Sequence, residues 1–180
     1  MITDAVNANQ LASELLVEEL VRLGVTAFFV SPGSRSTPLV VAAARHAKTS
    51  CYVHFDERGS AFAALGHARA NLSPAAWITT SGTAVANGLP AIVEASTDGV
   101  PLVAITADRP PELRKTGANQ TIDQPEIFRG FARWRFDLPP WHTKLDPAFL
   151  LTTVDHAVYR AVADLGPVHL NCMFREPLAP

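Results

Sequence analysis

Short apolar runs alternate with longer helical patterns along this 180-residue chain, and this alternation constrains the fold more than any other feature. The run from residue 25 to 30 is almost uninterrupted, as in a parallel strand covered on both faces. Strand, helix and strand at intervals of roughly 25 to 35 residues imply parallel pairing through right-handed crossovers. We therefore expect an α/β domain with a three-layer, doubly wound, mainly parallel six-stranded sheet. The other predicted strands lie near residues 51–55, 75–79, 101–106, 132–138 and 167–171.

The composition is that of a globular domain with a substantial core, since 48% of the residues are hydrophobic and 18% are charged. The charged fraction is below the usual value of about 25%, which indicates that some apolar helix faces meet a partner. The net charge of -2 gives no electrostatic argument for binding nucleic acid or an anionic membrane.

The cysteine pattern and the N-terminus predict a cytoplasmic protein without disulfides. Cys51 and Cys172 lie in separate predicted strands, so we expect core thiols rather than a disulfide framework or a metal cluster. His54 is likewise expected in the core. No apolar run reaches the length of about 18 residues that a membrane span needs, and no basic segment precedes an apolar one at the N-terminus.

Capping residues predict where the first and last helices begin. Asn7 or Asn9 can cap a first helix, which Gly24 would end. Asp146, followed by a proline, would open a long last helix.

Two neighbouring strand-to-helix junctions carry polar groups. The run at 51–55 continues into Asp56 and Glu57 and then into an alanine-rich helix. The strand at 75–79 continues into Ser81-Gly82 and a second helix of small residues. Carboxyl ends of parallel strands share one edge, where ligands bind, and a carboxylate there feels the positive end of a helix dipole. Plain helix capping, worth roughly 0.5 to 2 kcal/mol, explains the same residues and stays open.

Two further segments have the polar composition of binding loops. In SPGSRSTP at 31–38, Ser36 or Thr37 can cap a helix starting at Pro38, and helix N-terminal donors with Arg35 suit an anion. An ordinary turn with a solvated arginine fits this pattern equally well. The irregular stretch 107–125 is far longer than a usual loop, and such loops tend to be functional.

Five strings in this order resemble a known family. They resemble the N-terminal pyrimidine-binding domain of thiamine diphosphate enzymes and, more narrowly, the SEPHCHC (succinyl-enolpyruvyl-hydroxycyclohexene-carboxylate) synthase family of menaquinone biosynthesis. The resemblance implies the thiamine diphosphate-binding fold. The strings are SPGSRSTPL at 31–39, FDER at 55–58, TSGTAVAN at 80–87, TADRPPELR at 106–114 and TGANQTIDQ at 116–124.

The resemblance implies that Glu57 is the catalytic residue, hydrogen-bonded to N1′ of the cofactor's pyrimidine. It also implies that Ser81, Gly82, Thr83 and Asn87 lie beside that ring, with glycine permitting a close backbone approach.

The family decarboxylates 2-oxoglutarate and adds the resulting succinyl-semialdehyde carbanion to isochorismate. Both substrates carry carboxylates, which arginine and amide groups bind well. For Arg109, a weak surface salt bridge is the alternative. The substrate-binding positions implied by the resemblance are Ser34, Arg35, Arg109, Asn119 and Gln120.

The resemblance further implies that residues 1–180 are one domain of a longer enzyme, without its central and diphosphate-binding domains. The sequence contains no Gly-Asp-Gly motif, so we expect no metal ligand here: Mg²⁺ or Mn²⁺ would bind to the absent domain, and the isolated chain would be inactive. The expected partner is the diphosphate-binding domain of a second subunit in a homodimer or homotetramer. Helices at 59–70 and 82–96, poor in charge, would meet it.

Two other functions are compatible with parts of the pattern. One is another thiamine diphosphate enzyme, such as an acetolactate synthase or a 2-oxoacid decarboxylase. Its small monocarboxylate substrate would not require so many carboxylate-binding groups. The other is a non-catalytic α/β module that holds phosphate with the 31–38 loop, which would leave Glu57 unexplained.

Overall fold

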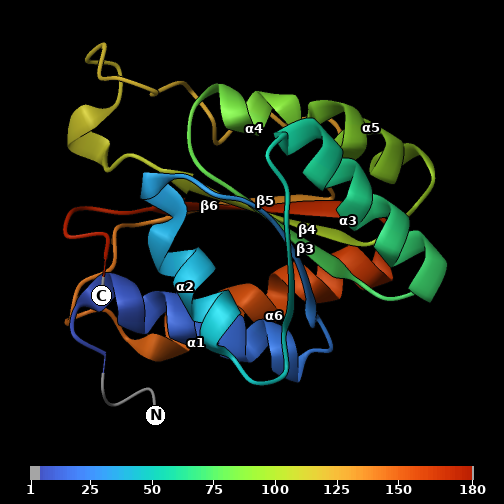
Figure 1. The fold of residues 1–180 in the computed structure, drawn as a ribbon, viewed down its shortest axis with the longest axis horizontal. Helices are drawn as coiled ribbons and strands as arrows, with labels where there is room; N and C mark the ends of the chain where they lie inside the picture. The colour runs from blue at the N-terminus through green and yellow to red at the C-terminus, as the bar shows by residue number, and fades with distance from the viewer. Residues whose placement is uncertain (1–4, 180) are drawn as a thin grey trace.

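A six-stranded, all-parallel sheet forms the centre of the computed structural model, which describes residues 5–179. Helices cover both faces, so the predicted three-layer α/β class is confirmed (Figure 1). The strand order is β2-β1-β3-β4-β6-β5. The strands are β1 (Ala27–Ser31), β2 (Ser50–Val53), β3 (Ala75–Thr79), β4 (Leu102–Asp108), β5 (Trp134–Leu138) and β6 (Pro167–Met173).

One face of the sheet is covered by α1 (Ala8–Arg22), α2 (Thr37–Arg45) and α6 (Pro147–Ala163), which lie below the sheet in Figure 1. Strand residues that alternate along β1 and β3, such as Phe28 and Ile78, face these helices and are fully buried. This alternation places one hydrophobic core on each side of the sheet.

The opposite face is covered by α3 (Glu57–Asn71), α4 (Thr83–Asn87) and α5 (Leu89–Thr97). The prediction of a single helix over 82–96 is wrong. The structure has two helices, α4 and α5, which are separated at Gly88. A Cβ atom on Gly88 would overlap the indole of Trp77, which is buried under this point. Only glycine allows the chain to approach the ring so closely.

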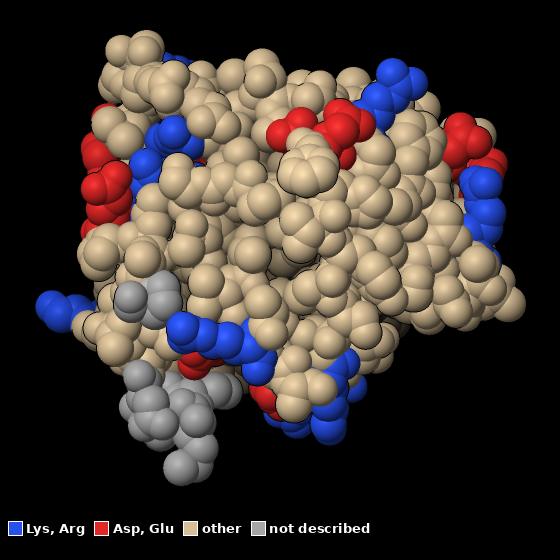
Figure 2. Space-filling view, in the orientation of Figure 1, with Lys and Arg blue, Asp and Glu red and all other residues tan. Residues whose placement is uncertain are grey.

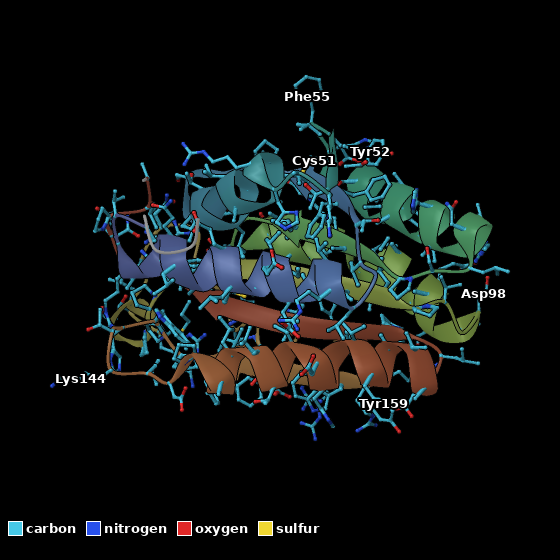
Figure 3. All side chains as sticks on the ribbon, turned by 90° about the horizontal axis from the view of Figure 1, so that it is seen from below. Cys51, Tyr52, Phe55, Asp98, Lys144 and Tyr159 are labelled. Carbon is cyan, nitrogen blue, oxygen red and sulfur yellow. The ribbon has the colours of Figure 1, made fainter. Side chains whose placement is uncertain are left out.

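The predicted burial of the second strand is also wrong. β2 is the edge strand, and all four of its residues are exposed. Cys51 is therefore an exposed thiol instead of a core thiol, and His54 is half-buried, whereas Cys172 lies in the core as predicted. In Figure 3, the Phe55 side chain projects away from the body of the domain beside Tyr52.

The capping predictions are confirmed at both ends of the chain. Asn7 caps α1 by accepting a hydrogen bond from the backbone N–H of Gln10, and Asp146 caps α6 through Ala148 N–H. Asn9 instead lies inside α1, where its side chain binds backbone carbonyls of the C-terminal segment. A short 3-10 turn, Ser34–Ser36, precedes α2.

The long segment from Arg109 to Arg133 contains one short 3-10 helix, η3 (Pro111–Leu113), and otherwise irregular turns. It leaves the carboxyl end of β4 and projects at one end of the sheet, drawn in yellow in Figure 1. None of the helices between residues 5 and 179 combines the length and apolarity that a membrane crossing requires.

Candidate functional site at the carboxyl edge of the sheet

The predicted site residues lie in segments that follow the carboxyl ends of the strands. Because all six strands are parallel, these ends share one edge. Ser34 follows β1, Glu57 follows β2, Ser81 follows β3 and Arg109 follows β4. A Cβ atom on Gly33 would overlap Thr80, so the loops after β1 and β3 are in direct contact.

Glu57 occupies the first turn of α3, directly after its N-cap Asp56. Asp56 does the capping, since its side chain accepts a hydrogen bond from Gly59 N–H at 2.6 Å. Glu57 instead accepts a hydrogen bond on Oε2 from Asn87 Nδ2 at 3.0 Å. Its other carboxylate oxygen has no hydrogen-bond partner within the part of the chain that the structure describes. Glu57 is therefore oriented by one neighbour and keeps one oxygen for a ligand.

The turn at Ser81 and Gly82 is tied to Gln120. Ser81 Oγ donates to the Gln120 carbonyl at 3.1 Å, and Gln120 Nε2 donates to the Ser81 carbonyl at 3.0 Å. Arg109 Nη1 also donates to Ser81 Oγ. Gly82 has φ +76°, which favours glycine, and a Cβ there would lie 2.8 Å from Gln120 Cγ. Four predicted site residues thus form one contact cluster.

Arg35 and the cluster member Arg109 are both buried, and Arg35 Nη2 lies 3.8 Å from the carboxylate of the exposed Glu176. Arg35 is 9% exposed and Arg109 is 8% exposed. Burial lowers the pKa of Arg109, and the nearby charge of Arg35 lowers it further. Arg35 Nη1 donates to the Phe174 carbonyl at 3.0 Å, while its Nε is buried without a partner among residues 5–179. Two neighbouring guanidinium groups with a free donor favour an anionic ligand.

Neither alternative for these arginines is found. Arg35 is buried, so it is not a solvated loop residue. Arg109 forms no surface salt bridge within the described chain, and Glu112 pairs with Arg175 instead.

Three predicted site residues stand apart from these contacts. Ser34, Thr83 and Asn119 are exposed, and their side chains form no hydrogen bond in the region from residue 5 to 179. They lie at the same edge, in the segments that carry Arg35, Gly82 and Gln120.

A row of polar residues crosses the sheet one layer below these loops. The strand register aligns one residue from each of five strands, and their side chains point to the α3–α5 face. The row reads Ser31, Thr79, Thr106, Asn171 and Asp137, from β1 to β5.

On the β4–β6–β5 half of this row, the two carboxylates and the Asn171 amide have hydrogen-bond partners, whereas Arg114 Nε and His169 Nδ1 are buried without one between residues 5 and 179. Asn171 Nδ2 donates to Asp137 at 2.7 Å and to Asp108 at 2.9 Å, and Arg114 binds both carboxylates at 2.6 Å. Burial acts to raise the pKa of Asp137, but hydrogen bonds from Arg114 and Asn171 outweigh it and hold that pKa below its usual value. The same pairing raises the pKa of Arg114.

His169, on β6, belongs to the same buried network. Its Nε2 lies 2.7 Å from Thr106 Oγ1, and its ring packs edge-on against Phe128. Burial lowers its pKa to about 3, so the ring is neutral at physiological pH.

The β1–β3 half of the row differs. Ser31 Oγ and Thr79 Oγ1 are buried and have no hydrogen-bond partner between residues 5 and 179. Ser60, in the first turn of α3, carries a third buried hydroxyl without a partner in the same range.

Sequence reasoning missed the residues that hold the long segment in place. Gln124 and Arg114 end two of the five strings, yet no role was assigned to them, and Asp137 lay in an ordinary strand pattern. The only signal for Asp137 was a polar residue near the end of a predicted strand, and the only signal for Arg114 and Gln124 was the polar composition of the long irregular segment. No three His, Cys, Asp or Glu side chains lie together as a metal site within residues 5–179.

Comparison with known proteins decides the family. Residues 11–127 match the family described as "Thiamine pyrophosphate enzyme, N-terminal TPP binding domain". The chain belongs to this family. The match covers the loops after β1, β2, β3 and β4, and therefore every predicted site residue.

The relatives extend the resemblance over nearly the whole chain. The 2-succinyl-5-enolpyruvyl-6-hydroxy-3-cyclohexene-1-carboxylate (SEPHCHC) synthase of Rubrobacter xylanophilus is 67% identical over 96% of this chain, and that of Salinibacter ruber is 63% identical over 99%. Protein PHYLLO, chloroplastic, of Arabidopsis thaliana is 52% identical over 98% of the chain. The narrower similarity to SEPHCHC synthases is confirmed. The chain spans 30% of the length of the two bacterial relatives and 10% of the plant one.

Proposed function

We propose that this chain acts as the N-terminal pyrimidine-binding domain of a SEPHCHC synthase, a thiamine diphosphate-dependent transferase of menaquinone or phylloquinone biosynthesis. The observation that carries the proposal is the buried pair Arg35 and Arg109 at the same edge as Glu57. The substrates 2-oxoglutarate and isochorismate carry several carboxylates. Two buried cations therefore suit them better than they suit a small monocarboxylate. The high identity to named synthases supports the same assignment.

The residues at this edge fit the pyrimidine end of the cofactor. Glu57 offers one unpaired carboxylate oxygen, and Asn87 fixes the other. When bound, thiamine diphosphate supplies the chemistry that breaks and forms carbon–carbon bonds next to a carbonyl group. Glu57 would hold a proton at pyrimidine N1′, which is its catalytic role in this proposal. Ser81, Gly82 and Thr83 would line the ring.

The substrate carboxylates would contact the donors that face this edge. Arg35 and Arg109 supply the charge, and Gln120 and Asn119 supply amide groups from the long segment. Ser34 adds a hydroxyl at the mouth of the 31–38 loop. Burial strengthens each charge-assisted hydrogen bond, because fewer water molecules compete for the donors.

The diphosphate and its cation belong, in this proposal, to a different domain of a longer cytoplasmic enzyme. Mg²⁺ or Mn²⁺ would bind there together with the diphosphate, and the 180 residues alone would not turn over substrate. The chain's share of the relatives' length supports this division.

Assembly with a second subunit would cover the exposed apolar side chains next to Glu57. Phe55 is fully exposed, and Val53 and Phe62 are also exposed. Large areas of the face shown in Figure 2 carry neither positive nor negative side chains. We propose a homodimer or homotetramer in which the partner's diphosphate-binding domain covers this edge. Sedimentation of a full-length Phe55→Ser variant should show a shift toward smaller species.

The decisive experiment is an assay of a full-length synthase that carries this domain. It should consume 2-oxoglutarate only in the presence of thiamine diphosphate and a divalent cation, and couple it to isochorismate. Conversion of pyruvate without use of 2-oxoglutarate would instead identify an acetolactate synthase or decarboxylase. Tight binding of a sugar phosphate by the 180-residue chain, with no activity in the long form, would identify a phosphate-binding module.

A further inference from the structure

Gln124 bridges three parts of the molecule that are far apart in sequence. Its side chain is fully buried. The amide oxygen accepts a hydrogen bond from Gly82 N–H at 3.1 Å, and the amide nitrogen donates to Asn171 Oδ1 at 2.7 Å and to the Ala107 carbonyl at 2.9 Å. One side chain thus ties the turn after β3 to β4 and β6.

The base of this bridge is the β4–β6–β5 half of the polar row. Asn171 accepts from Gln124 and donates to Asp108 and Asp137, which Arg114 neutralises. Every one of these groups is held by at least one hydrogen bond. The hydrogen bonds that tie Asn171 to Gln124 and to both carboxylates can therefore fix the position of the groups they contact.

The other end of the bridge holds the turn that carries Ser81 and Gly82. Gly82 is the N-cap residue of α4 and has φ +76° and ψ -142°. Residues with a side chain rarely adopt this conformation. Its N–H is directed to Gln124 Oε1. Ser81, next to it, accepts a hydrogen bond from Arg109. A shift of Gly82 would therefore move the group that positions Arg109.

We propose that Gln124 is a positioning residue for the site: it fixes the Ser81–Gly82 turn relative to β4 and β6 and thereby sets the affinity for thiamine diphosphate. It touches neither substrate nor reacting atoms. The effect on cofactor affinity rests on the proposed function, whereas the structural link between Gln124 and Gly82 does not.

The first test measures backbone hydrogen exchange in the 180-residue chain. The Gln124→Met variant keeps the length of the side chain but removes both hydrogen-bonding groups. Exchange at Gly82 N–H should become at least about tenfold faster, because its acceptor is lost. Exchange at Thr106 and Ala107, inside β4, should change less than about twofold.

Two further variants make this test specific. Asp123→Asn changes an exposed neighbour whose side chain forms no hydrogen bond in the described structure, so exchange at Gly82 should stay at the parental rate. Gln124→Asn keeps a buried amide but is one methylene too short to reach from Ala107 to Gly82. Gln124→Asn should accelerate hydrogen exchange at Gly82 N–H in the same way. It therefore tests the positioning role even if the methionine variant does not fold.

The second test measures thiamine diphosphate affinity in a full-length synthase. Gln124→Met should raise the Kd for the cofactor about tenfold, while kcat at saturating cofactor changes less than about threefold. A general loss of packing would lower the unfolding midpoint without this split between Kd and kcat.

The outcomes separate the two proposals. Unchanged exchange at Gly82, or equal acceleration throughout β4 and β6, would overturn the positioning role. Selective acceleration at Gly82 with an unchanged cofactor Kd would also overturn its effect on affinity. A full-length protein that does not use 2-oxoglutarate and isochorismate would refute the proposed function and leave the exchange result valid.

Discussion

The two halves of the carboxyl edge differ in how their buried polar groups are satisfied. On the β4–β6–β5 half, Asp108, Asp137 and Asn171 are paired with one another or with Arg114. On the β1–β3 half, Ser31 and Thr79 have no partner in the described structure, and the neighbouring β2 is exposed.

This difference teaches which half is built for a ligand. Carboxylates that already have hydrogen-bond partners gain little from an added molecule, whereas a buried hydroxyl without a partner costs free energy until a ligand binds it. The β1–β3 half also carries Glu57, with one free carboxylate oxygen. We therefore propose that catalysis takes place at this half and that the other half anchors the long segment.

The largest expected effect is on the open half. Glu57→Gln in a full-length synthase should lower turnover by about 10² to 10⁴-fold, because an amide cannot share a proton with the pyrimidine in the same way. Circular dichroism should show an unchanged fold. Glu94→Gln, on the exposed side of α5, is the matched control. Parental turnover in the Glu57 variant would remove this residue from the mechanism.

The anchoring half should instead respond through stability. Arg114→Met leaves the fully buried Asp108 carboxylate without its cation, and the free energy of unfolding should fall by about 2 to 4 kcal/mol. Urea unfolding of the 180-residue chain measures this loss. Arg175→Met, which breaks only the exposed pair with Glu112, should leave the midpoint nearly unchanged. Equal effects of the two substitutions would show that the network does not anchor the segment.

The buried arginines should affect substrate use before cofactor binding. Arg109→Lys and Arg35→Lys keep the charge but lose the planar fork, so kcat/KM for the carboxylate substrates should fall by about tenfold to a hundredfold. The Kd for thiamine diphosphate should stay within about twofold. Arg69→Lys at the opposite edge, where Arg69 pairs with Asp98, serves as the control. An equal loss of cofactor affinity would contradict the substrate role.

The stability of the domain should also depend on pH through His169. Its pKa falls from 6.5 to about 3 on burial, so the unfolded chain takes up a proton below pH 6.5 that the folded chain refuses. Stability should therefore decrease as the pH falls below 6.5, by at most about 1.4 kcal/mol per pH unit. Loss of the favourable Asp137 pairing adds to this decrease at the acidic end, because its folded pKa is depressed.

Urea midpoints measured across this pH range give the test. His169→Leu should flatten the profile, whereas replacement of the exposed His142 by leucine should not. A variant at residue 169 with the parental slope would assign the pH dependence to other groups.

Much of the fold and of the site's location was predictable because both depend on local patterns. Apolar runs marked the strands, and polar residues directly after them marked the carboxyl edge, where Glu57, Ser81 and Arg109 lie. The single helix over 82–96 was a wrong prediction because Pro90, in the first turn of α5, has no backbone N–H to continue the hydrogen bonds of α4. The roles of the site residues stay predictions until the variants are measured.

The sequence by itself determined the layers of the domain and the order in which polar groups leave the strands, because side-chain period and turn residues act over a few neighbouring positions. Only the tertiary structure decided that β2 lies at the exposed edge, although its residues look like those of a buried strand. It also decided that Gln124 reaches Gly82. Strand order and a contact between residues 42 positions apart depend on the free energy of packing the whole chain. A local sequence pattern does not contain this information.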